Sequence, residues 1–153
     1  MLPPLSRVFE ICLYSLLNFF PFLIFALYPF LDDLRFSRTK TGLLIVVLTF
    51  LQILFGLLAC FSTGNISAVL SLISTLSYAF FYFTVIRKSP GQLLFVLLMI
   101  SNIANLVVIT AKCLEGQFFP DFALLPYRYS MSLFMVIVEI FILIPVFIFL
   151  KKV

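Results

Sequence analysis

Five long apolar runs, separated by short polar stretches, dominate the pattern of this chain. A run of roughly 17–25 residues is long enough to cross the hydrocarbon core of a bilayer as a helix. On this criterion we predict membrane-spanning helices at residues 8–31, 42–61, 66–86, 93–111 and 129–150. The first run exceeds the apolar core of a signal peptide, which has about 7–15 residues, so we expect it to remain as a span.

The polar segments between the runs predict how neighbouring spans connect. Residues 62–65 read Ser-Thr-Gly-Asn, which is a compact turn signal. The second and third spans should therefore form a tight helical hairpin. Residues 89–91 read Ser-Pro-Gly and should break the chain again before the fourth span.

The composition decides the class of protein. Of the 153 residues, 64% are hydrophobic and only 10% are charged, whereas soluble domains are about 45–50% apolar and about 25% charged. A folded soluble domain of this length still exposes to water about a third of the surface that its unfolded chain exposes. It therefore cannot bury so many apolar residues. This excludes a soluble enzyme, a nucleic-acid-binding domain and a disordered tail. We predict an all-α integral membrane protein, a five-helix bundle forming one domain over residues 1–153 in the cell membrane.

The distribution of Lys and Arg predicts the orientation of the bundle. Five spans place the N-terminus, the 62–65 turn and residues 112–128 on one side, with only Arg7, Lys112 and Arg128 as basic residues. Because basic residues accumulate on the cytoplasmic side, we expect the N-terminus outside and the C-terminus in the cytoplasm. The other side carries seven basic residues: Arg35, Arg38, Lys40, Arg87, Lys88, Lys151 and Lys152.

The inventory of reactive side chains argues against catalysis. The chain has no His, so it has neither an imidazole base nor a His-ligated metal. Its three cysteines, Cys12, Cys60 and Cys113, follow no zinc or disulfide pattern, and at most one bridge among them is conceivable. We expect no enzyme activity, no metal and no cofactor.

The predicted outer loop, residues 112–128, is rich in aromatic and charged side chains. An apolar ligand with a polar end could contact both kinds of group, and Pro120 and Pro126 would stiffen the loop. The alternative interpretation is that the rings only anchor the loop at the headgroups. The candidate ligand-binding residues are Lys112, Phe118, Phe119, Asp121, Tyr127 and Arg128.

A second candidate feature is a layer of polar residues near the bilayer midplane. Counted from the outer end of each span at about 1.5 Å per residue, one polar residue per helix falls roughly 12–15 Å deep. A protonated Glu139 could donate a hydrogen bond to Asn102 or Gln52, and its protonation or pairing could bias the bundle between two arrangements. The alternative is a static hydrogen-bonded centre. The layer comprises Asn18, Gln52, Ser74, Asn102 and Glu139, with Asn105 beside it.

Short strings along the chain resemble a known family. Tyr-Pro-Phe at 28–30, Ser-Asn-Ile-Ala-Asn at 101–105, Ala-Lys-Cys-Leu-Glu at 111–115 and Pro-Tyr-Arg at 126–128 resemble the membrane region of GHKL-type sensor histidine kinases of Firmicutes, including the accessory-gene-regulator type. This resemblance implies a bacterial cytoplasmic-membrane sensor that perceives a small secreted peptide or apolar ligand and signals to a cytoplasmic kinase half; a homodimer is compatible with it. The sequence ends at Val153 without kinase motifs, so catalysis is not carried over.

Two other classes of function remain open. One is a small membrane transporter, or an accessory subunit, that binds a substrate within the helix bundle. The odd number of spans and the lack of internal similarity count against the inverted repeats of many transporters. The other class is a structural or assembly protein of the membrane.

Overall fold

The computed structural model describes residues 4–152, and this part of the chain is helical with no strand. Five helices are long and apolar enough to cross a membrane, as predicted. The elements are α1 (Leu5–Leu27), the 3-10 helix η1 (Tyr28–Phe30), α2 (Arg38–Phe61), α3 (Asn65–Val85), α4 (Pro90–Phe118), α5 (Pro120–Ala123) and α6 (Tyr129–Lys152).

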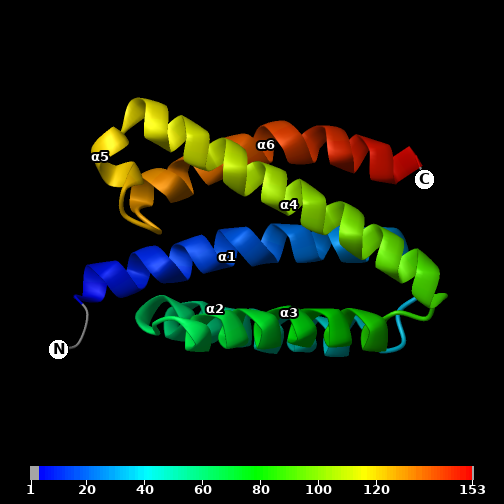
Figure 1. Cartoon of the computed structure of the whole chain (residues 1–153). Coiled ribbons are helices and arrows are strands. Elements are labelled where there is room, and N and C mark those ends of the chain that lie inside the picture. Colours follow the sequence, from blue (N-terminus) through cyan, green and yellow to red (C-terminus); the bar gives the residue numbers. More distant parts are fainter. Residues whose placement is uncertain (1–3, 153) are drawn as a thin grey trace.

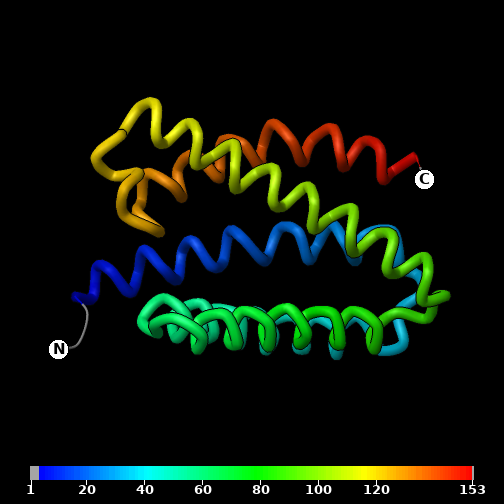
Figure 2. The backbone as a smooth tube through the Cα atoms, in the orientation of Figure 1, coloured from blue at the N-terminus to red at the C-terminus, as the bar shows by residue number. Residues whose placement is uncertain are grey.

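The long helices run roughly side by side (Figure 1). The α2–α3 hairpin lies along one side of α1, and α4 and α6 lie on the other (Figure 2). The N-terminus and the C-terminus are at opposite ends of the bundle. We call the end that contains α5 and the α2–α3 turn the α5 end, and the opposite end, with η1 and the C-terminus, the η1 end.

Local sequence signals explain where several helices begin. Ser37 caps α2, because its hydroxyl accepts a hydrogen bond from the backbone N–H of Lys40 at 3.3 Å. Gly64 allows the tight α2–α3 turn, since its φ of 58° is readily adopted only by glycine. Pro90 occupies the first turn of α4, where its missing N–H has no helical partner to lose. The predicted hairpin and the break before the fourth span are both confirmed.

The fourth span was predicted too short. It was expected to end at residue 111, with a loop over 112–128, but α4 continues to Phe118 and is followed by α5. The extension contains good helix formers, and the ammonium of Lys112 pairs with the carboxylate of Glu115 at 2.8 Å one turn later. Helix formation depends on these local interactions, whereas the prediction followed only the apolar run. Pro120 then ends α4, since the preceding Phe119 is forced out of the helical region.

The η1 end is fastened by contacts between two loops. Leu34 and Ile86 form an antiparallel bridge, and the backbone N–H of Arg35 donates to the carbonyl of Val85 at 2.8 Å. Lys88 pairs with Asp33 at 3.2 Å. Beneath these loops the buried Tyr82 hydroxyl donates to the carbonyl of Ala26 at 3.0 Å. These contacts join the α1–α2 connection firmly to the α3–α4 connection.

Buried and exposed apolar residues are distributed as expected for helices in lipid. The core lies where α1, α4 and α6 meet and includes the fully buried Leu23, Ile100 and Met135. Large apolar side chains also cover the outside of the bundle, where a bilayer would surround them. The most exposed described phenylalanines in the spans beyond α1 are Phe50, Phe80, Phe95 and Phe141.

Candidate functional site

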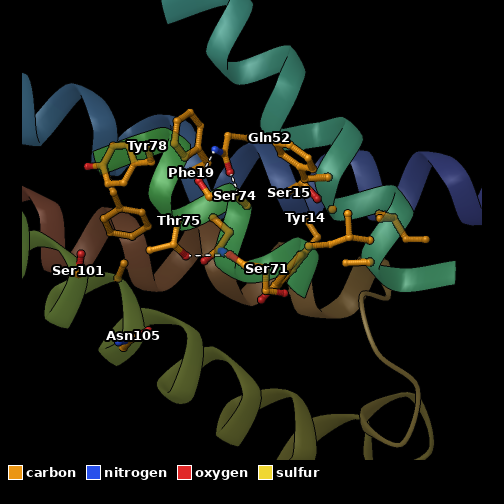
Figure 3. Close-up of a pocket in the computed structure, with 18 of the residues that line it drawn as sticks. Tyr14, Ser15, Phe19, Gln52, Ser71, Ser74, Thr75, Tyr78, Ser101 and Asn105 are labelled. Atoms are coloured by element: carbon orange, nitrogen blue, oxygen red, sulfur yellow. Dashed lines mark hydrogen bonds between the residues drawn. The ribbon is translucent and has the colours of Figure 1, made fainter. Parts of the chain in front are cut away.

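A polar cavity of about 500 Å³ lies between α1, α2, α3 and α4 (Figure 3). Its polar lining consists only of hydroxyl and amide side chains, with no Asp, Glu, Lys or Arg. Aromatic rings of Phe19, Phe22 and Phe55 complete the wall. The polar residues are Tyr14, Ser15, Asn18, Gln52, Ser71, Ser74, Thr75, Tyr78, Ser101, Asn105 and Tyr127.

Hydrogen bonds organise the α2–α3 side of the cavity. The Gln52 amide donates to the backbone carbonyl of Ser74 at 3.0 Å and accepts from the Ser74 hydroxyl. Thr75 donates to the carbonyl of Ser71 within α3 at 3.0 Å. Ser101 and Asn105 come from α4, apart from this network (Figure 3). Both are exposed, so their polar groups are accessible to a molecule in the cavity.

The packing of helices explains why a cavity forms here. α3 and α4 are joined at the η1 end and diverge toward the α5 end (Figure 1). On the opposite wall, α1 and α2 approach closely at Gly56, where an added Cβ would collide with the Ser15 hydroxyl. The α2–α3 hairpin therefore stays close to α1 while α4 moves away from α3, which leaves the space between them.

Tyr127 lines the cavity from the connection between α5 and α6. Its ring lies 4.5 Å, centroid to centroid, from that of Tyr14, and it lines the cavity. Its φ of 59° is unusual for a residue with a Cβ, so the surrounding contacts must hold the backbone in place. Burial raises the pKa of Tyr127; nearby Cys60 adds to this effect and Arg7 opposes it.

A cluster of charged residues holds the segment that carries Tyr127. The Arg7 guanidinium donates to the carbonyl of Pro126 and, at 3.4 Å, to that of Tyr127. Arg7 also pairs with the buried carboxylate of Glu10 at 3.0 Å, and Arg128 approaches the same carboxylate at 3.7 Å. Glu10 thus fixes two arginines that position the backbone over the cavity.

The other predicted ligand-binding residues lie toward the α5 end and differ in their contacts. Phe118 stacks on Phe134 of α6 with centroids 5.7 Å apart, and Phe119 contacts the same ring at 6.1 Å. The Arg128 guanidinium lies over the Phe122 ring at 5.4 Å. Lys112 pairs with the fully buried Glu115, and Asp121 is exposed in the first turn of α5.

The predicted polar layer is divided between two sites. Asn18, Gln52, Ser74 and Asn105 all line the cavity, whereas Asn102 is exposed and lies outside its lining. Glu139 lines a separate groove between α1 and α6.

The expected hydrogen bond from Glu139 to Asn102 or Gln52 is absent among residues 4–152, and the Glu139 Oε1 atom is buried without a partner. Counting residues from the outer end of a span gives the depth of a residue in the membrane but not the direction in which its side chain points. α6 packs against α1 and α4, which keeps Glu139 away from Gln52 on α2.

Several cavity residues were not predicted as site residues. Ser15, Thr75 and Ser101 lie three or four positions from Asn18, Ser71 and Asn105 and so share their helix faces. Polar residues at this spacing more often serve helix packing, so their spacing alone does not indicate a site. A comparison of the stripes on all four helices would have suggested a shared cavity.

Metal and disulfide chemistry find no support in the described part of the chain. It contains no group of three metal-ligating side chains, and Cys12, Cys60 and Cys113 are all free.

No protein-family model matches this sequence, and neither curated proteins nor solved structures yield a match.

Proposed function

We propose that this chain is the sensing membrane region of a signalling protein, with a binding rather than a catalytic role. A small, partly apolar ligand from outside, such as a secreted peptide, occupies the central cavity, and the bundle relays its presence to a cytoplasmic partner or domain. The observation that carries the proposal is the cavity itself, lined by eleven hydroxyl or amide side chains and no charged one. Such a lining suits an uncharged ligand with hydrogen-bonding groups.

The segment around Tyr127 supports entry at the α5 end. With the N-terminus outside, as the basic residues favour, this end faces the exterior. Tyr127 combines an unusual backbone conformation with a position at the edge of the cavity. A ligand that displaces the Tyr127 ring from Tyr14 would let the backbone leave this unusual conformation. This segment would therefore be the first part of the chain to move when a ligand binds.

The arrangement of helices supports a relay to the C-terminus. α1 and α4 both line the cavity, and both pack against α6. At the η1 end, the Leu34–Ile86 bridge joins the α1–α2 connection to the α3–α4 connection. A shift of α4 at the cavity would therefore move α6, whose last turn carries Lys151 and Lys152.

A filled cavity can test the relay without knowledge of the natural ligand. Ala104 of α4 lines the cavity, so Ala104→Phe places a ring where a ligand would lie. Nitroxide labels on cysteines introduced at Lys40 and Lys151, after replacement of the native cysteines, report the distance between α2 and the end of α6 in nanodiscs. We expect Ala104→Phe to shift this distance by about 1–2 Å or more, the scale of helix movements in switching proteins.

Leu106→Phe is the matched control, because Leu106 lies on the same helix, is 54% exposed and does not line the cavity. It should leave the distance unchanged. A distance that is the same in Ala104→Phe and the unfilled chain would contradict a sensing role and favour a static assembly protein.

A transporter or accessory subunit is the second candidate, because it would use the same cavity within the bundle. It would also need a route from the cavity to the η1 end. A cysteine at Ser74, tested with a membrane-impermeant maleimide from each side, distinguishes the two. Reactivity from both sides would favour transport, and reactivity from the α5 side alone would favour sensing.

A further inference from the structure

Glu139 occupies a groove that is separate from the central cavity. The groove has a volume of about 430 Å³, lies between α1 and α6, and shares no lining residue with the cavity. Glu139 is its one polar lining residue. The others are apolar: Leu17, Phe25, Val136, Ile140, Leu143, Ile144 and Phe147.

The carboxyl group of Glu139 lacks the partners that a buried group of this kind requires. The residue is only 6% exposed, and its Oε1 atom has no hydrogen-bond partner in the described chain. An unsatisfied carboxyl group in an apolar environment is costly, and more so when it is ionised. An intramembrane carboxyl group in this state indicates a partner that completes it.

Pro21 leaves one backbone carbonyl of α1 without its helical hydrogen bond. Pro21 lies within α1 and has no N–H, so it cannot bind the carbonyl of Leu17 four residues earlier. Leu17 and Phe25 both line the groove, and Pro21 lies between them at the same four-residue spacing. The groove therefore combines an apolar wall with one carboxyl group, and among its described lining residues only Glu139 has a side chain that could donate or accept a hydrogen bond.

We propose that this groove binds a lipophilic amine. The apolar body of the ligand would lie against the aliphatic and aromatic residues, and its protonated amino group would pair with Glu139. An ammonium supplies both a positive charge and N–H donors, so it can balance the charge of the carboxylate and hydrogen-bond to it at the same time. An alcohol supplies one donor and leaves the charge of a carboxylate unbalanced. The volume of the groove lies in the range typical of small-molecule sites.

Photo-crosslinking can test this proposal on the full chain in phosphatidylcholine nanodiscs. The probe is dodecylamine with a diazirine in its alkyl chain, and the neutral probe is the corresponding dodecanol. Mass spectrometry then locates the labelled residues, which separates the groove from general partition into lipid. We expect the amine to label the groove-lining part of α6 around Leu143 and Phe147, and excess dodecylamine to compete.

Substitution of Glu139 decides the role of the carboxylate. Glu139→Gln preserves size and folding but removes the charge, and it should lower amine labelling of the groove about tenfold, as expected for loss of a hydrogen bond to a charged group. Asp121→Asn removes an exposed carboxylate outside the groove and should leave labelling unchanged. Equal labelling of the groove in Glu139→Gln and the unaltered chain would overturn the proposal. Equal, Glu139-dependent labelling by the alcohol would also overturn it.

Discussion

Gln52 and Ser74 illustrate how one pair of side chains can join two spans. The Gln52 amide uses both its donor and its acceptor on Ser74, one in a bond to the backbone and one in a bond to the hydroxyl. Hydrogen bonds between membrane helices contribute about 0.6–1.7 kcal/mol. We expect Ser74→Ala to destabilise the bundle by this amount, measured by unfolding in dodecyl sulfate.

Ser77 provides the control for this substitution. Its hydroxyl donates to the carbonyl of Ile73 within the same helix, so Ser77→Ala removes a hydroxyl from α3 without removing a contact between helices. The change should be close to zero. Equal effects of the two substitutions would show that the Gln52–Ser74 pair does not stabilise the hairpin.

We also predict that the negative charge of Glu10 stabilises the bundle. Glu10 is 5% exposed and lies near two guanidinium groups, whereas Asp32 forms a pair with Arg38 in which both side chains are exposed. Glu10→Gln should lower stability by about 1–3 kcal/mol, since it leaves partly buried arginines without their charged partner. Asp32→Asn should change stability by less than about 0.5 kcal/mol. Thermal unfolding of the two variants in nanodiscs would compare them, and similar losses would contradict the role of Glu10.

Gly56 sets the distance between helices α1 and α2. A Cβ at this position would collide with the Ser15 hydroxyl and lie 3.3 Å from the Ser15 Cβ. We expect Gly56→Ala to destabilise the bundle by about 1–3 kcal/mol, as overpacked contacts do. Ser15→Gly in the same chain should restore part of this loss, because it removes the colliding hydroxyl and the Cβ while adding the cost of about 0.5–1 kcal/mol of a glycine in a helix.

Gly116 is the matched control for the helix propensity of alanine. It lies in α4, and a Cβ added there would meet open space, so Gly116→Ala should stabilise the helix by about 0.5–1 kcal/mol. Denaturant titrations of the three variants would give these values. A failure of Ser15→Gly to rescue Gly56→Ala would show that the contact with α1 is not the cause.

The sequence predicted these elements well where a local signal determines them. The five apolar runs and the Gly64 turn sufficed for the helices and the hairpin. The end of α4 could not be read from hydropathy, because the ion pair of Lys112 with Glu115 extends the helix beyond the apolar run. The depth count grouped Asn18, Gln52 and Ser74, which line one cavity. It also included Glu139, and the rotation of α6 that separates Glu139 from them depends on packing among distant segments.

The two ends of the bundle differ in their number of basic residues, which bears on the side of the membrane that each end faces. The η1 end and the C-terminal turn of α6 together carry seven basic residues, and the loops there are held by backbone hydrogen bonds and the Lys88–Asp33 pair. At the α5 end, Arg7, Lys112 and Arg128 are all engaged with Glu10 or Glu115. Orientation follows the number of Lys and Arg residues and gives their acidic partners little weight, so the seven basic residues against three favour a cytoplasmic η1 end.

Reporter fusions would test this orientation. Alkaline phosphatase is active only outside the cytoplasm, and green fluorescent protein matures in the cytoplasm, so the two give opposite signals at each position. With the N-terminus outside, phosphatase should be active after Asn65 and Phe119, and fluorescence should follow fusion after Lys88 and Val153. Replacement of Arg35, Arg87 and Lys88 with Gln removes three of the seven basic residues and should lower this preference, because orientation follows the difference in Lys and Arg between the two sides. Phosphatase activity after both Lys88 and Val153 would reverse the orientation and place the opening beside Tyr127 in the cytoplasm.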